Sequence, residues 1–84
     1  MFLRVTDVKL LRGYQLHVTF NDGVVKEVDL ERELYGEVFE PLKDKKLFWQ
    51  VAVNPETNTV EWANGADFAP EFLYEIGEEV ERVA

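Results

Sequence analysis

Residues 14–20 alternate strictly between apolar and polar side chains, and this alternation restricts the possible folds more than any other feature of the sequence. The apolar members are Tyr14, Leu16, Val18 and Phe20. A period of two is typical of an antiparallel strand with one buried and one solvated face. Asn21-Asp22-Gly23 follows, and these residue types tolerate the positive φ of a hairpin turn. We therefore expect a return strand over residues 24–30.

The segment before this hairpin predicts a further strand over residues 2–11, with a turn at Arg12-Gly13. Its apolar residues do not keep one parity, which favours a β-bulge. On the return strand, Lys26 falls among the inward positions. A lysine there is expected to extend its amine to the surface or to mark a sheet edge.

Short helical segments are predicted after the third strand. Asp29 is a plausible N-cap for a helical segment that ends before Gly36, and Pro41 can open a single helical turn in the connection 37–46. Residues 47–53 are apolar on both parities, which predicts a central strand covered on both faces. A shorter strand over residues 59–62 would place Val60 and Trp62 on one face.

A terminal helix is predicted to open at Pro70, with Ala69 as its cap residue. Alanine is a poor cap, so Asp67 is expected to compensate with a side-chain bond to the turn. Gly77 weakens the helix and can end it. Its apolar face is predicted to comprise Phe72, Leu73, Ile76 and Val80.

The order of these elements predicts an α+β fold. We expect residues 1–84 to form one domain, with an antiparallel sheet of about five strands in the order β-β-β-α-β-β-α and helices packed on one face.

The net charge of −8 argues against nucleic-acid binding, because phosphates repel such a surface, and favours a basic protein partner. Cysteine is absent, which excludes disulfides and thiolate chemistry. No apolar run approaches the roughly 20 residues of a membrane span. We therefore expect a soluble, cytoplasmic protein without membrane contact.

Three pieces of the chain resemble a known family. They are YQLHVTFNDG at residues 14–23, VDL at residues 28–30, and WANGADFAPEFLYE at residues 62–75. Together they are similar to the small bacterial family catalogued as domain of unknown function 2442, over about residues 2–76. The most specific motif positions are Trp62, Asn64, Gly65, Asp67, Pro70, Leu73 and Tyr74. The resemblance implies an α+β fold and no established catalytic residues. It also implies a suggested antitoxin role, and an appended helix-turn-helix in some members, for which this sequence is too short.

No combination of residues predicts catalysis, so we expect a protein that is not an enzyme and holds no cofactor or metal. His17 is the one histidine, and neither serine nor cysteine is present as a nucleophile for it to activate. Asp22, Asp29 and Asp67 could form a carboxylate set, but a local turn or cap role accounts for each.

Contact residues are the remaining candidates. Trp49, Trp62 and Tyr74 are either core aromatics or contact residues, and Trp49 is the strongest candidate for contact. Asn64, Gly65 and Asp67 either shape a turn or present amides to an anion. We expect a protein-interaction module. The narrower expectation is that the chain itself is the antitoxin-like partner of a small basic toxin. The alternatives are a homo-oligomeric structural or regulatory domain, and a small-ligand site at the 64–67 turn.

Overall fold

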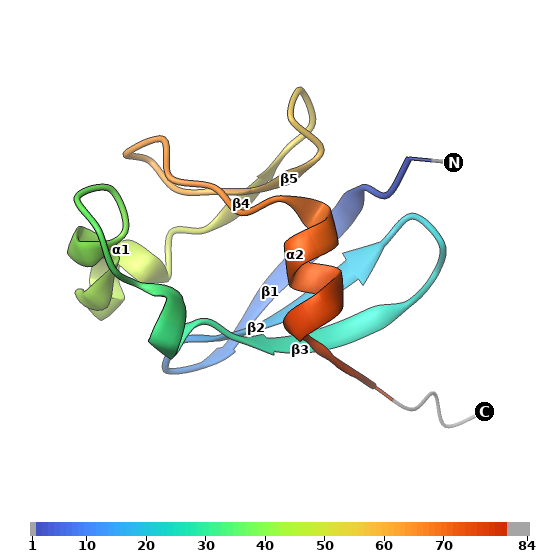
Figure 1. Ribbon diagram of the computed structural model, residues 1–84, viewed down its shortest axis with the longest axis horizontal. Helices are drawn as coiled ribbons and strands as arrows, with labels where there is room; N and C mark the ends of the chain where they lie inside the picture. Colours follow the sequence, from blue (N-terminus) through green and yellow to red (C-terminus); the bar gives the residue numbers. More distant parts are fainter. Residues whose placement is uncertain (1, 81–84) are drawn as a thin grey trace.

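The computed structural model describes residues 2–80 and shows an α+β fold with two antiparallel sheets (Figure 1). The larger sheet has four strands in the order β1-β2-β3-β6, and the smaller one pairs β4 with β5. The strands are β1 (Val5–Arg12), β2 (Gln15–Phe20), β3 (Val25–Asp29), β4 (Ala52–Asn54), β5 (Thr59–Glu61) and β6 (Glu78–Glu79). The helices are α1 (Lys45–Phe48) and α2 (Pro70–Ile76), with 3₁₀ turns η1 (Glu31–Glu33) and η2 (Glu40–Lys43).

Strand β2 follows the predicted alternation. Leu16, Val18 and Phe20 of β2 are each at most 1% exposed. Register shifts interrupt the β1–β2 pairing near each end of β1, which confirms the expected irregularity. The turn between them is displaced by one residue from the prediction, because Gly13 has φ 50° and Tyr14 lies in the turn rather than in β2.

Helix α2 lies across one face of the larger sheet (Figure 1). Leu73 is fully buried in this interface, and the ring of Tyr74 meets that of Phe20 edge-on at 4.9 Å between centroids. Lys26 donates to the backbone carbonyl of Tyr74, and its Nζ lies 4.2 Å from the centroid of that ring. A lysine that binds carbonyls at a helix C-terminus also compensates the helix dipole. The Lys26 amine is thus held part-buried at the end of α2, which differs from the expected extension to the surface.

The end of α2 differs from the prediction. The helix ends at Ile76, and Glu78–Glu79 form β6, which pairs with β3. Val80 was expected on the helical face, but it lies beyond the helix and its N–H donates to the Val25 carbonyl at 2.9 Å. The edge of β3 offered unpaired backbone groups, and pairing them accounts for this extended conformation. Gly77 makes it possible, because it sits directly against Lys26 and Val28.

The prediction of a central strand over residues 47–53 is wrong. The carboxylate of Asp44 accepts the Lys46 N–H at 3.0 Å and starts α1, so this segment begins as a helical turn. Only Ala52–Asn54 is extended, and it belongs to the smaller sheet. Within the segment Phe48 is fully buried, while Leu47 and Trp49 are 43% and 49% exposed. A single helical turn buries one side chain and exposes its neighbours, a pattern that two-faced burial in a strand would not give.

The remaining local predictions are largely confirmed. Asp29 accepts the Glu31 N–H at 3.0 Å and supports η1, although the cap position itself is Leu30. Pro41 lies in the first turn of η2, and Ala69 is the extended N-cap of α2. Within residues 2–80, no helix is long and apolar enough to cross a membrane.

Candidate contact surface

The six residues selected from the sequence occupy different environments. Trp62 is 2% exposed and belongs to the core, where its indole N–H donates to the Phe48 carbonyl at 2.8 Å. Tyr74 is half-buried at the junction of α2 and the sheet. Trp49 is exposed over about half its surface, and its indole N–H donates to the Gly13 carbonyl at 3.1 Å. Of the three aromatic candidates, Trp49 is therefore the one most available to a partner.

The Asn64 turn serves the fold. The Asn64 Oδ1 accepts the Ala66 N–H at 3.1 Å, and its Nδ2 donates to the Val38 carbonyl at 2.8 Å. Gly65 has φ 86°, in the left-handed region that favours glycine. Asp67 forms a backbone bridge with Glu61. The side-chain turn bond expected from Asp67 is thus made by Asn64, which also fastens the turn to the connection after η1.

Most of the large exposed apolar side chains come from one segment of the chain. Of the seven such side chains in residues 2–80, four lie between positions 35 and 49, the green segment that begins beyond η1 and ends in α1 (Figure 1). They are Tyr35 (70% exposed), Val38 (48%), Leu47 (43%) and Trp49 (49%). We call these four residues, together with Pro41, the contact face. Concentrated exposed apolar surface of this kind marks interaction sites more often than isolated exposed residues do.

A groove with a volume of about 350 Å³ shares Pro41 and Leu47 with the contact face. Its apolar walls come from Pro41 and Leu42 of η2, from Leu47 of α1 and from Ala63. Gln50 and Asn64 complete the lining. Loop 62–66 therefore supplies one wall of the groove and the η2–α1 segment the other.

Buried aromatic contacts hold the contact face on the core. The Phe48 ring packs edge-on against Tyr14 at 5.3 Å and tilted against Trp62 at 5.5 Å. The Tyr14 hydroxyl donates to the Lys43 carbonyl, which ties η2 to the β1–β2 turn. These contacts fix the backbone that presents Leu47 and Trp49 to solvent.

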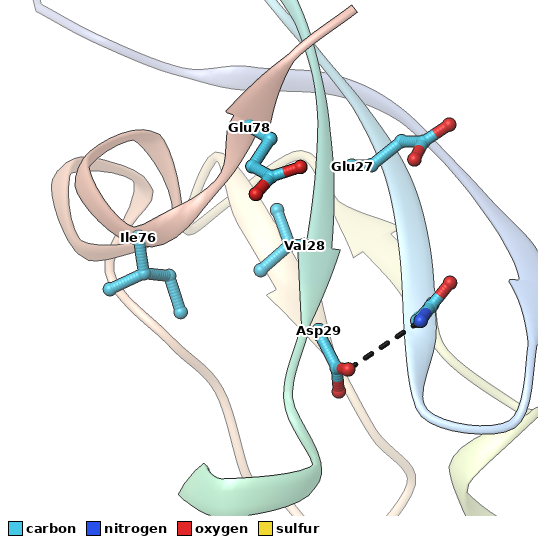
Figure 2. A pocket seen from close by; sticks show the side chains of 6 residues that line it. Glu27, Val28, Asp29, Ile76 and Glu78 are labelled. Atoms are coloured by element: carbon cyan, nitrogen blue, oxygen red, sulfur yellow. Dashed lines mark hydrogen bonds between the residues drawn. The ribbon is translucent and has the colours of Figure 1, made fainter.

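A second, acidic pocket of about 240 Å³ lies beside β3 (Figure 2). Its lining residues are Gln15, Glu27, Val28, Asp29, Ile76 and Glu78. Figure 2 shows Val28 and Ile76 on one side of β3 and Glu27 on the other, with Asp29 near the lower end of the strand. Gln15 Nε2 donates to Asp29 at 3.5 Å. In the part of the chain that the structure describes, no group of three or more His, Asp or Glu side chains could hold a metal ion.

The other ionisable candidates lie apart. Asp22 precedes β3 and Asp29 ends it, so these carboxylates stand at opposite ends of one strand. His17 lies opposite Lys9 and Glu27 on neighbouring strands, and its Nδ1 is buried without a hydrogen-bond partner. The structure thus does not bring together the carboxylate set considered from the sequence.

A hydrogen bond between Asp22 and Tyr74 connects the β2–β3 turn to α2. The Tyr74 hydroxyl donates to Asp22 Oδ2 at 2.9 Å, and the Val24 N–H donates to Oδ1 at 2.9 Å. The Val24 bond, aided by Tyr74, holds the pKa of Asp22 below its ordinary value of 3.8. The bond to Asp22, with desolvation, raises the pKa of Tyr74 above 10.0.

These shifts predict a stability window with two limits. A lowered carboxyl pKa stabilises the fold above about pH 4, and this contribution is lost as the pH falls through the folded pKa. A raised phenol pKa stabilises the fold below about pH 10, and this contribution is lost as the pH rises through the folded pKa.

In Tyr74→Phe we expect the loss of stability at alkaline pH to diminish and the pKa of Asp22 to rise toward 3.8. Denaturant unfolding across pH and NMR titration of the Asp22 carboxyl measure both. An unchanged Asp22 pKa would contradict the assigned bond.

The groove was not predicted from the sequence. Trp49 was selected because its segment was thought to be a two-faced strand, and it is exposed for a different reason, the short helix α1. Leu47, Pro41 and Ala63 were not selected at all. The available signal was Asp44 before Lys45-Lys46, an N-cap pattern that predicts a helical start and exposed flanking side chains.

With this geometry in hand, the comparisons with known proteins define the family. The sequence pattern of the family described as Protein of unknown function (DUF2442) matches residues 5–79, so the chain belongs to that family. Among solved structures, the chain is similar to the crystal structure of a "putative DNA binding protein" from Nitrosomonas europaea, with 28% identity and a TM-score of 0.78. The alignment covers 90% of this chain and 49% of that one, so the chain spans about half its length. Among curated proteins, no significant match was found.

Proposed function

We propose that this chain is a protein-interaction module that binds its partner through the contact face. The observation that carries the proposal is that four of the seven large exposed apolar side chains in residues 2–80 come from the single segment 35–49. They are Tyr35, Val38, Leu47 and Trp49. Partly exposed aromatic and large aliphatic side chains beside a groove are typical anchors of protein interfaces. The proposal assigns no reaction to the chain, and places its action in the cytoplasm, in line with the absence of cysteine.

The test compares two leucines of similar exposure. Leu47 is 43% exposed on the contact face, and Leu11 is 38% exposed on β1. A tagged chain is used to capture proteins from lysate of its native host, and each captured protein is then repurified with the tagged variants. We expect the partner to bind wild type and Leu11→Ser equally and to be lost from Leu47→Ser. Equal binding to all three would contradict the contact face.

The alternative to a different partner protein is self-association of this chain through the same exposed apolar residues. Light scattering over a range of concentrations distinguishes it, because a homo-oligomer using Leu47 would dissociate in Leu47→Ser and persist in Leu11→Ser. A monomer at all concentrations would leave the heterologous partner as the occupant.

A second candidate, the antitoxin-like partner of a small basic toxin, is favoured by the acidic pocket beside β3. Glu27, Asp29 and Glu78 surround it, and the apolar Val28 and Ile76 could contact the methylenes of a lysine or arginine. The net charge of −8 would accelerate encounter with a basic partner. Binding that is lost in Glu27→Lys/Glu78→Lys and retained in Leu47→Ser would support this candidate over the first.

DNA contact is not part of the proposal. The similar Nitrosomonas europaea protein has about half its length outside the shared region. The charge of −8 opposes binding to phosphates here, since non-specific DNA affinity comes from cationic side chains. We propose that this chain itself makes no DNA contact. In an electrophoretic mobility-shift assay with duplex DNA, we expect no salt-dependent binding by this chain.

A further inference from the structure

The groove on the contact face has almost no polar capacity left for a ligand. Both functional atoms of the Asn64 side chain are used within the fold, by Val38 and Ala66. The other lining side chains are apolar except for Gln50, which is exposed and makes no side-chain hydrogen bond within residues 2–80. Small-molecule sites usually combine an apolar lining with several convergent polar groups. This groove therefore suits an apolar side chain, with Gln50 available to the backbone beside it.

Two lysines are sequence neighbours of residues that line the groove. Lys43 follows Leu42 and Lys46 precedes Leu47, so two of the lining leucines each have a lysine next to them. Both lysines are exposed, and neither pairs with a carboxylate in the part of the chain that is described. Lys45 lies between them, with its Nζ 5.7 Å from the centroid of the Tyr14 ring.

Two carboxylates share this stretch, and one of them is already engaged. Asp44 caps α1 through the Lys46 N–H, and Glu40 is the first residue of η2, next to Pro41 of the groove. Over residues 40–46, three lysines against these two carboxylates give a net charge of +1, in a chain of net −8. Charges separated by more than about 8 Å are largely screened at physiological salt, so the local charge of residues 40–46 matters more to a docked segment than the net charge of the chain.

We propose that the groove receives an apolar side chain from a partner protein, and that carboxylates flanking this side chain pair with Lys43 and Lys46. This inference rests on the proposed function and specifies the chemistry of the partner segment. It reverses the expectation from the net charge of the whole chain, because the partner segment is acidic where it meets the groove.

The test uses a defined probe and matched charge changes. A short peptide with one leucine flanked by glutamates is titrated into the labelled chain and followed by amide chemical shifts; the same peptide with lysines in place of glutamates is the control ligand. We expect the glutamate peptide to shift Leu42, Leu47 and Ala63. In Lys43→Glu/Lys46→Glu we expect roughly tenfold weaker binding, since each exposed charge pair contributes a fraction of that factor. Arg4→Glu/Lys9→Glu, with the same change in charge on and next to β1, should bind like wild type.

Three outcomes would overturn the inference. Tighter binding of the lysine peptide at the same residues would refute the acidic partner while leaving the contact face intact. The absence of shifts at the groove with either peptide would remove the groove as the anchor site, whereas the contact face itself is tested independently by partner capture with Leu47→Ser. Shifts at these residues that grow with protein concentration alone would assign the groove to a second copy of the chain.

Discussion

Phe48→Ala is expected to lower the free energy of unfolding by about 3–5 kcal/mol, because it removes a fully buried ring and leaves a cavity. The total stability of a chain this size is roughly 4–13 kcal/mol, so the loss is a large share of it. Urea unfolding followed by circular dichroism measures the change. The ring also connects the contact face to the core through Tyr14 and Trp62. Partner binding should therefore fall even where the variant remains folded.

Phe2→Ala is the matched control, because Phe2 is 90% exposed and its truncation should change stability by less than about 0.5 kcal/mol. A loss below about 1 kcal/mol for Phe48→Ala would show that the Phe48 site is not part of the packed core. The assignment of Leu47 and Trp49 as exposed neighbours of a buried Phe48 would then fail as well.

Gly77→Ala is expected to destabilise the fold by about 1–3 kcal/mol through overpacking. A Cβ at this position would lie 2.9 Å from the Leu73 carbonyl oxygen, 2.9 Å from Lys26 Cβ and 3.0 Å from Val28 Cγ2. The backbone itself accepts alanine, since φ is −74°. The sign of the effect is the test, because glycine-to-alanine substitution without a clash stabilises by about 0.4–1 kcal/mol. A stabilised Gly77→Ala would contradict the close approach of α2 to β3.

Local signals were sufficient for the three-stranded part of the fold. The alternation through Leu16, Val18 and Phe20 fixed which face is buried, because a shift of one residue would expose all three. Turn residues placed the hairpin at Asp22-Gly23, and Pro70 placed the start of α2. These features depend on neighbours in sequence, which is why sequence reasoning could find them.

Long-range contacts decided the features that were missed. Residues 78–80 are extended because β3 has a free edge, and no local pattern in Glu78-Glu79 reports that edge. The strand prediction for residues 47–53 failed because a four-residue helix is too short to show a helical period in the sequence. In the structure Phe48 fills the core while Leu47 and Trp49 face outward. Lys26 lies among the inward positions as the alternation predicts, but its amine binds the Tyr74 carbonyl of α2, a partner that is distant in sequence.

The contact residues show the same division. Trp49 is the strongest contact candidate from the sequence, with a core position left open. The groove requires η2, α1 and loop 62–66 to meet, and packing around Phe48 and Trp62 sets how they meet. Trp62 and Asn64 matched the family motif and proved to be parts of the scaffold for the contact face. Their side-chain bonds to Phe48 and Val38 hold the two walls of the groove together.

Amide hydrogen exchange on the complex with the captured partner tests the contact face most directly. We predict that partner binding slows exchange in residues 37–50 and 63–64 and leaves the β3–β6 edge unchanged. Slowed exchange confined to residues 26–29 and 76–79, with residues 37–50 exchanging as in the free chain, would contradict the account and place the partner on the acidic pocket.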